Sequence, residues 1–271
     1  MTLLVVGASG YLGGEVCRQA VAAGERVVGT YHANPVELAG VEVRRLDVTD
    51  RAAVRALVAA VRPAAVVNTP YRYDDWAVTA DGAARVACAA VEAGARLVHL
   101  SSDALHAGRP QPYADDDAPT PVFPYGAAKA AAETAVRAID PGAALVRTSL
   151  IVGDERSRQI RLCLEALAGG MALFTDEVRC PVDVGDLAAA VLELAQGDHA
   201  GLLNVAGPEA VSRAELGLLV ARRFGLDPAG LRTATSAASG LARPVEVRLD
   251  SSRAAGLLRT RLRGVSELLA P

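Results

Sequence analysis

The stretch Leu3-Leu-Val-Val-Gly7-Ala-Ser-Gly10-Tyr-Leu-Gly13 decides the fold of this chain. Its four apolar residues predict a short buried strand, and the glycines that follow lead into a helix predicted over residues 13–23. Glycines at this spacing let the backbone turn tightly and approach a pyrophosphate, to which the start of a helix offers free N–H groups. The motif therefore predicts a dinucleotide-binding turn, and the alternative is an ordinary glycine turn of another α/β fold.

Strands and helices alternate through the rest of the first half of the chain. The apolar pattern predicts strands at residues 27–31, 41–46, 65–68, 96–101 and 143–149, and helices at 50–61, 76–93 and 125–139. Such alternation indicates right-handed crossovers between parallel strands. The sequence therefore predicts an α/β fold with a doubly wound parallel sheet, a Rossmann fold.

After about residue 150 the alternation becomes irregular. Helices are predicted near 156–168, 184–196, 211–224 and 263–270, with strands at 202–205 and 245–249. We therefore expect a dinucleotide-binding Rossmann core over residues 1–150. A smaller substrate-binding lobe is expected over 151–271, with 183–206 returning to the core.

Composition excludes several classes of protein. The 271 residues carry 28 Lys and Arg against 31 Asp and Glu, and 51% of all residues are apolar. A chain this long and this apolar can bury a full core, which excludes an intrinsically disordered protein. The near-neutral charge argues against nucleic acid or an anionic membrane surface as a partner, and no apolar stretch approaches the roughly 20 residues that span a bilayer. A small-molecule substrate is the expected partner.

The four cysteines, Cys17, Cys88, Cys163 and Cys180, lie far apart, with no CxxC pair and no histidine at metal-ligand spacing. Because the N-terminus does not resemble a secretory signal, we expect reduced thiols in the cytoplasm and no metal site. The three carboxylates of Asp115–Asp117 are expected in a solvated loop rather than around an ion. The oligomeric state stays open, and a homodimer is compatible with the sequence.

The end of the second strand bears on the choice of cofactor. A carboxylate often stands there to hold the ribose hydroxyls of NAD, but this chain has Thr30-Tyr31-His32. Without the acid a 2′-phosphate meets no repulsion, so NADP(H) is expected in preference to NAD(H), with Tyr31 and His32 beside the adenosine. His32 either contacts the phosphate or is a solvated loop histidine. Asp47-Val48 is expected at the adenine, and the alternative is that Asp47 begins a turn.

A second group of polar residues predicts chemistry. Ser101-Ser102-Asp103 ends the fifth predicted strand, and Tyr125-Gly-Ala-Ala-Lys129 opens the next helix. Four residues make about one helical turn, so the Tyr125 hydroxyl and the Lys129 ammonium share one face. We expect the nearby cation to lower the pKa of the Tyr125 phenol, and the Ser102 hydroxyl to polarise the same substrate oxygen.

With these motifs in place, the chain resembles the extended short-chain dehydrogenase/reductases, and within them the dTDP-4-dehydrorhamnose reductases and related sugar-nucleotide reductases. The resemblance runs through most of the chain. It rests on Gly7–Gly13, Val66-Val67-Asn68, Ser101-Ser102-Asp103, Pro112-Tyr113 with Asp115–Asp117, Tyr125–Lys129 with Glu133, Arg147-Thr148-Ser149 and Phe174–Leu187.

The resemblance implies roles for individual residues. It implies Ser102, Tyr125 and Lys129 as the catalytic set. It also implies a cofactor site that includes Tyr125 and Lys129 together with Gly7, Ser9, Gly10, Tyr11, Leu12, Gly13, Asn68, Thr69, Pro70 and Ser149. Tyr71, Asp103 and His106 are expected at the substrate, and the alternative for His106 is a solvent-facing loop.

The chain departs from the family at two points. Small alanines usually follow the asparagine of the fourth strand, whereas here Pro70, Tyr71 and Arg72 are expected to reshape the substrate entrance. Nucleotide-sugar 4,6-dehydratases typically carry an Asp-Glu pair after the catalytic serine, whereas Ala104 follows Asp103 here, which argues against dehydration. Tyr73 and Trp76 are expected either to stack on substrate or to pack against a helix.

Taken together, the sequence predicts an NADP(H)-preferring reductase of a carbonyl, with a nucleotide-linked 4-keto sugar as the expected substrate. Two alternatives stay open: an epimerase that retains its NAD, and a cofactor-bound regulatory subunit without activity. The regulatory alternative is disfavoured because such relatives commonly lose the tyrosine or the lysine, and this chain keeps both.

Overall fold

The computed structural model describes residues 1–240 and 242–271. Its centre is a seven-stranded sheet in the order β11-β6-β5-β4-β1-β2-β3, and all of its neighbouring strands are parallel. The strands are β1 (Thr2–Val6), β2 (Arg26–Tyr31), β3 (Val41–Arg45), β4 (Ala65–Asn68), β5 (Arg96–Leu100), β6 (Ala144–Arg147) and β11 (Gly201–Asn204). Since β1 lies between β4 and β2, the strand order reverses there, and ligands of such sheets bind at this point.

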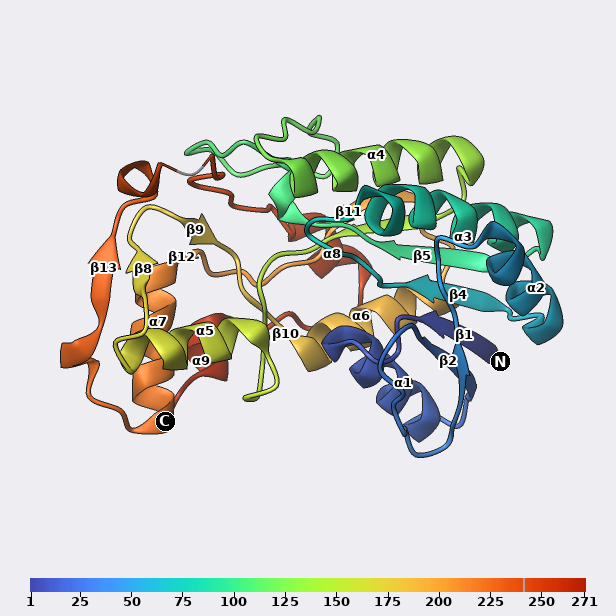
Figure 1. Ribbon diagram of the computed structural model, residues 1–271, viewed down its shortest axis with the longest axis horizontal. Helices are drawn as coiled ribbons and strands as arrows, with labels where there is room; N and C mark the ends of the chain where they lie inside the picture. Colours follow the sequence, from blue (N-terminus) through green and yellow to red (C-terminus); the bar gives the residue numbers. More distant parts are fainter. Residues whose placement is uncertain (241) are drawn as a thin grey trace.

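Helices cover both faces of the sheet, as Figure 1 shows. One face carries α2 (Arg51–Val61), α3 (Gly82–Glu92) and α4 (Pro124–Ile139), and the other carries α1 (Tyr11–Ala22) and α6 (Val184–Gln196). The side chains of β1 alternate between the two layers: Leu3 and Val5 pack with the α1 and α6 side, and Leu4 and Val6 with the α2 to α4 side. The predicted doubly wound parallel sheet is therefore confirmed.

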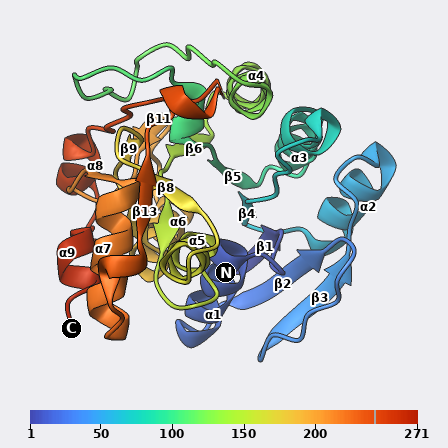
Figure 2. The ribbon, with the colours of Figure 1, turned by 60° about the vertical axis from the view of Figure 1, so that its left-hand side comes forward.

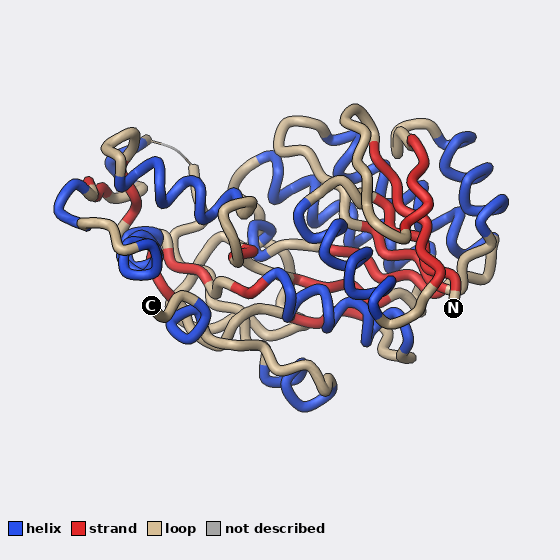
Figure 3. The backbone as a smooth tube through the Cα atoms, turned by 90° about the horizontal axis from the view of Figure 1, so that it is seen from below, coloured by secondary structure: helices blue, strands red, loops and turns tan. Residues whose placement is uncertain are grey.

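The second half of the chain builds a lobe beside the carboxyl ends of the strands, at the left of Figure 1 and of Figure 3. Its core joins α5 (Arg158–Leu167), α7 (Arg213–Phe224) and α9 (Val265–Leu268). Short paired strands border these helices: β7 (Ile151–Val152) with β10 (Val182–Asp183), β8 (Ala172–Phe174) with β13 (Arg232–Ala234), and β9 (Val178–Arg179) with β12 (Val211–Ser212). Figure 2 brings this lobe forward and shows it beside the twisted main sheet.

Two predicted elements differ in the structure, and several short helices are additional. Residues 245–249 do not form a strand, since isolated bridges pair Glu246 with Val178 and Leu249 with Tyr113. The helix expected over 76–93 begins as a π-helix, η1 (Ala77–Asp81), before α3. The further short helices are η2 (Asp103–Leu105), η3 (Pro228–Gly230), η4 (Ala237–Ser239) and α8 (Ser252–Leu257). Within 1–240 and 242–271, none of the helices has the length and apolar character to cross a bilayer.

Candidate active site

The turn between β1 and α1 has the form of a phosphate cradle. Gly7 adopts a φ of +86°, its N–H donates to Thr30 Oγ1 over 3.0 Å, and its carbonyl accepts from the Gly10 N–H over 2.9 Å. No side chain caps the start of α1, and the first N–H groups of a helix have no acceptor within the helix. These groups belong to Tyr11, Leu12 and Gly13, which line a cavity. The uncapped helix start thus offers donors and a partial positive charge to an anion.

Gly13 and Gly10 are needed in this turn for different steric reasons. A Cβ on Gly13 would lie 2.2 Å from the Gly7 carbonyl oxygen, so Gly13 allows α1 to pack directly on the turn. A Cβ on Gly10 would have one neighbour within 4 Å, the Gly7 carbonyl oxygen at 3.2 Å. The remaining space around it belongs to the cavity that Gly10 lines. The space at Gly10 therefore fits a pyrophosphate that approaches the backbone.

Two cavities meet along the turn. The larger, about 540 Å³, lies over the carboxyl ends of β5 and β6 and faces the second lobe. Of the predicted site residues it is lined by Gly10, Tyr11, Leu12, Gly13, Thr69, Tyr71, Ser102, Asp103, Tyr125, Lys129 and Ser149. The smaller, about 210 Å³, is lined by Gly7, Ser9, Tyr31, His32, Asp47, Val48, Pro70 and Tyr71. A dinucleotide laid over the turn would reach into both cavities.

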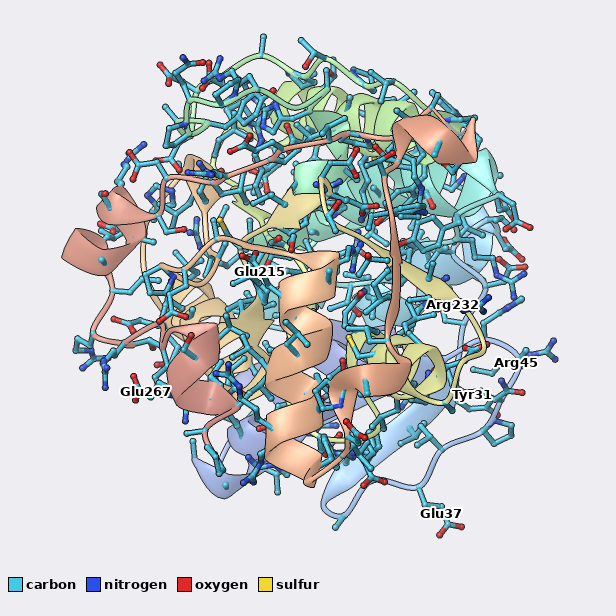
Figure 4. The ribbon with its side chains drawn as sticks, turned by 90° about the vertical axis from the view of Figure 1, so that its left-hand side faces the viewer. Tyr31, Glu37, Arg45, Glu215, Arg232 and Glu267 are labelled. Carbon is cyan, nitrogen blue, oxygen red and sulfur yellow. The ribbon has the colours of Figure 1, made fainter. Side chains whose placement is uncertain are left out.

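The smaller cavity lies at the paired ends of β2 and β3, where Figure 4 labels Tyr31 and Arg45. His32 Nε2 lies 3.5 Å from Asp47 Oδ2, and Arg45 Nε donates to the His32 carbonyl over 3.3 Å. The Asp47 carboxylate also accepts the N–H and hydroxyl of Thr49, which holds its pKa below the usual range. Asp47 thus starts a turn, as the alternative predicts, and it also lines the smaller cavity, while its contact with adenine stays a prediction.

The catalytic candidates converge in the larger cavity. Ser102 follows β5, where its Oγ accepts the Ala104 N–H over 3.2 Å and so begins η2. Tyr125 stands in the first turn of α4, which Pro124 opens, and lines the same cavity as Ser102. Lys129, one turn further along α4, is buried and donates to the Leu100 carbonyl over 2.9 Å.

The expected effect of Lys129 on the Tyr125 phenol is not found. Burial, with the neighbouring Tyr73 and Tyr71 hydroxyls, raises the pKa of Tyr125 well above its usual value. The pKa of Lys129 is itself lowered to about 8 by burial. The reason is geometric, because the ammonium is turned to the Leu100 carbonyl and lies 5.5 Å from the centre of the Tyr71 ring.

Residues 1–270 match the family described as RmlD substrate binding domain. The chain belongs to this family. It is 30% identical over 255 residues to dTDP-4-dehydrorhamnose reductase of Mycobacterium tuberculosis, covering 87% of this chain and 79% of that protein.

Solved structures agree with this membership of the RmlD family. The crystal structure of a hypothetical dTDP-4-dehydrorhamnose reductase from Sulfolobus tokodaii matches with a TM-score of 0.85 at 27% identity, covering 97% of both chains. The dTDP-4-dehydrorhamnose reductase of Bacillus anthracis, solved in complex with NADP, has the same fold, with a TM-score of 0.81 at 20% identity over 99% of this chain and 96% of that one. The resemblance inferred from the motifs is therefore confirmed.

An aromatic group surrounds Tyr125 in this RmlD family member. The ring centres of Tyr73, Tyr71 and Phe123 lie 4.3, 5.6 and 6.0 Å from that of Tyr125. The rings of Tyr71 and Tyr73 thus place the 70–73 loop against Tyr125, and a role of this loop at the substrate entrance stays a prediction. Trp76 is 51% exposed and does not line either cavity.

Sequence reasoning missed the wall that the second lobe contributes. Four arginines line it around the buried Glu177, which pairs with Arg213 at 3.0 Å, Arg243 at 3.1 Å and Arg179 at 3.4 Å. Arg158 completes the group, 5.0 Å from the centre of the Tyr73 ring. Glu177 and Arg179 lie within the Phe174–Leu187 stretch that carried the resemblance, but the other arginines come from separate elements and form no sequence motif.

Two predicted residues lie away from the cavities. His106 is fully buried and stacks on Tyr113 with ring centres 3.9 Å apart, so neither expectation for it, substrate contact or a solvent-facing loop, matches the structure. Its pKa falls to about 3 because burial penalises the imidazolium. Asn68 lines neither cavity and contacts His99 Nδ1 through Nδ2 at 3.0 Å. No group of three or more His, Cys, Asp or Glu side chains in the described ranges is arranged to hold a metal ion.

Proposed function

We propose that this chain is an NADPH-dependent reductase of a nucleotide-linked 4-keto sugar. The observation that carries the proposal is one cavity that joins Ser102, Tyr125 and Lys129 to the uncapped start of α1. Membership of the RmlD family and the name of the Mycobacterium tuberculosis relative support the same reaction.

The phosphate-binding side of the proposal rests on charge. The end of β2 has no carboxylate, Arg72 lines the smaller cavity together with Asp47 and His32, and Arg45 Nε donates to the His32 carbonyl. Arginine pairs well with phosphate, so these groups favour the 2′-phosphate of NADP(H) over the free hydroxyl of NAD(H). The turn at Gly10 would hold the pyrophosphate.

Each catalytic side chain has a task in carbonyl reduction. Reduced nicotinamide, when bound, supplies the hydride. Tyr125 gives its phenolic proton to the carbonyl oxygen, and its raised pKa keeps that proton in place at neutral pH. Lys129 uses one of three N–H donors on the Leu100 carbonyl, which leaves donors for the ribose hydroxyls of the cofactor.

The substrate class follows from the second-lobe wall. Arg158, Arg179, Arg213 and Arg243 carry four positive charges there, against the two carboxylates Asp103 and Glu177. A wall with this excess of guanidinium groups suits the diphosphate of a nucleotide-linked sugar, because arginine binds phosphate through paired hydrogen bonds. Tyr73 and Phe123 offer flat apolar contacts beside it.

We also propose that residues 1–150 with 183–206 form the cofactor-binding unit and that the rest of 151–271 binds substrate. The supporting packing is that α6 contributes Leu187 and Val191 to the same core as α1, and that β11 extends the main sheet beside β6.

The test is an absorbance assay of NADPH with a panel of nucleotide-linked 4-keto sugars. We expect the wild type to oxidise one NADPH for each carbonyl that it reduces and to bind NADPH more strongly than NADH. We expect Tyr125→Phe to bind the cofactor but to turn over about two to four orders of magnitude more slowly. Full turnover in Tyr125→Phe would contradict the mechanism. Conversion without net NADPH consumption would support the epimerase alternative, and binding without conversion the regulatory one.

A further inference from the structure

Tyr73 connects the two halves of the protein at the larger cavity. Its ring centre lies 4.3 Å from that of Tyr125, with 37° between the two ring planes. Arg158, the first residue of α5, places its guanidinium carbon 5.0 Å from the centre of the Tyr73 ring. All three side chains line the cavity. The Tyr73 ring therefore links the candidate catalytic tyrosine of α4 to a cation of the second lobe.

The Tyr73 ring contributes to the covering of Tyr125, which has to meet the substrate carbonyl in the proposed reaction. Tyr125 is 6% exposed although it lines the cavity, whereas Tyr73 is 48% exposed. Tyr73 is also the nearest of the three aromatic rings around Tyr125. Because so little of Tyr125 is exposed, a sugar carbonyl can reach its hydroxyl only after a covering side chain has moved. Tyr73, which is half exposed itself, is the side chain best placed to move.

Arg158 differs from the other arginines of the second-lobe wall. Those three pair with Glu177, whereas Arg158 is exposed and forms no ion pair within the described part of the chain. The contact of an exposed guanidinium with an aromatic ring is weak, but a guanidinium holds a phosphate through paired, charge-assisted hydrogen bonds. A diphosphate in the cavity therefore competes successfully with the Tyr73 ring for Arg158.

The backbone next to Tyr73 is anchored, so the movement falls to the side chain. The Arg72 N–H donates to Thr79 Oγ1 over 2.8 Å, and the Thr79 hydroxyl donates to the Arg72 carbonyl over 2.8 Å. Thr79 lies in η1 and is 1% exposed. The residue before Tyr73 is thus held on η1, and a change of side-chain rotamer at Tyr73 would take its ring away from Tyr125.

We propose, on the basis of the reductase function above, that Tyr73 is a specificity-determining residue that makes access to Tyr125 depend on the diphosphate of the substrate. In the free protein the ring covers Tyr125, and Arg158 helps to hold it there. A nucleotide-linked sugar binds Arg158 through its diphosphate, the ring turns away, and the carbonyl takes its place beside Tyr125. Any keto sugar has to displace the ring, but only one with a diphosphate gains the contact with Arg158 that offsets this cost.

A first experiment follows the ring without any turnover. The protein carries 3-fluorotyrosine at its six tyrosines and is saturated with NADP⁺, so that the cofactor site is filled. The ¹⁹F NMR signals of Tyr73 and Tyr125 are assigned by their loss in Tyr73→Phe and Tyr125→Phe. Because stacked rings shift each other's signals, we expect uridine diphosphate or thymidine diphosphate to move both signals, and uridine or thymidine to leave them in place. A diphosphate that binds by calorimetry but leaves the Tyr125 signal in place would overturn the proposal.

Variants show whether the shift comes from the Tyr73 ring and Arg158. In Tyr73→Ala without nucleotide, the Tyr125 signal should already lie near its position in the liganded wild type. Arg158→Met should reduce the shift that saturating diphosphate causes, because the ligand no longer competes with the ring for this cation. The matched control is Arg161→Met, an exposed arginine of the same helix that donates to the Arg156 carbonyl, and it should keep the full shift. A full shift in Arg158→Met would contradict the proposal.

A second experiment measures specificity. We compare kcat/KM for a nucleotide-linked 4-keto sugar with kcat/KM for the methyl glycoside of the same sugar, which has no diphosphate. Loss of one aromatic stack in Tyr73→Ala should raise kcat/KM for the methyl glycoside by about three- to tenfold and so narrow the preference. Tyr73→Phe keeps the ring and should keep the wild-type preference. An unchanged or lower kcat/KM for the methyl glycoside in Tyr73→Ala would refute the role of the ring.

Failure of the proposed function gives a different pattern. A wild-type protein that oxidises no NADPH with any keto sugar would refute the reductase, while the fluorine signals would still decide whether a diphosphate moves Tyr73 away from Tyr125. A nucleoside diphosphate that does not bind at all would overturn both the role of Tyr73 and the proposed substrate class.

Discussion

Arg147 and Glu133 form a buried ion pair within the Rossmann core. Arg147 Nε and Nη2 donate to the two carboxylate oxygens of Glu133 over 3.0 and 2.8 Å, and the two side chains are 1% and 3% exposed. Arg147 Nη1 also donates to the carbonyls of Asp115 and Asp117 over 3.0 and 2.8 Å. The guanidinium therefore ties the end of β6 to α4 and to the 115–117 loop.

Replacing Arg147 by Met removes both side-chain hydrogen bonds that the buried Glu133 carboxylate accepts, and leaves the Lys129 ammonium as the cation that interacts with it. Breaking a buried pair on one side costs about 3–5 kcal/mol, since the remaining charge has lost its hydrogen-bonded partner and cannot reach water. We expect Arg147→Met to lose this much of the free energy of unfolding, measured by urea denaturation. The double variant Glu133→Leu/Arg147→Met should recover most of the loss, because both charges are then gone.

The exposed pair Arg55–Glu92, with side chains 69% and 44% exposed, is the control. Arg55→Met should change the free energy of unfolding by no more than about 1 kcal/mol. A loss in Arg147→Met as small as in Arg55→Met would refute the argument, and so would a double variant as unstable as the single one.

Three further predictions concern the site. Burial lowers the pKa of Lys129 to about 8, so the ammonium loses its proton at a lower pH in the folded state than in the unfolded one. The melting temperature of the wild type should therefore rise as the pH goes from about 8 to about 10.5. The melting temperature of Lys129→Met should lack this rise. His106→Phe should keep the stack on Tyr113 and leave the kinetics of NADPH oxidation unchanged, whereas a raised KM would return His106 to the substrate site. Arg243 is 41% exposed, and Glu177 still pairs with Arg179 and Arg213 when Arg243 is removed. Arg243→Ala should therefore raise KM for a diphosphate-linked substrate by about tenfold and leave kcat unchanged. An unchanged KM would show that Arg243 does not bind the phosphate groups.

The sequence was sufficient for those parts of the site that depend on local pattern. The Gly7–Gly13 turn follows its strand and opens its helix as predicted, because tight turns and helix starts are set by a few consecutive residues. Tyr125 and Lys129 share a helix face by spacing alone, and both line the larger cavity with Ser102.

What could not be predicted depends on burial and on contacts between distant segments. The pKa of Tyr125 rises because its side chain is buried and because Tyr73 and Tyr71 lie beside it, and nothing in the Tyr-x-x-x-Lys pattern shows that environment. The arginine wall comes from α5, β9, α7 and the segment after residue 241, so it forms only when the chain folds. His106 follows the catalytic strand closely in sequence, yet its ring turns away from the cavity to stack on Tyr113.

In the proposed reaction, hydride passes from NADPH to a carbonyl carbon in the cavity of Ser102, Tyr125 and Lys129. The most direct measurement uses NADPH deuterated at the transferable position of C4, with a nucleotide-linked 4-keto sugar, and locates the label by NMR of the product. We expect one deuterium on the carbon that carried the carbonyl, and no labelled product from Tyr125→Phe within the time of a wild-type reaction. Product without deuterium at that carbon would exclude direct hydride transfer.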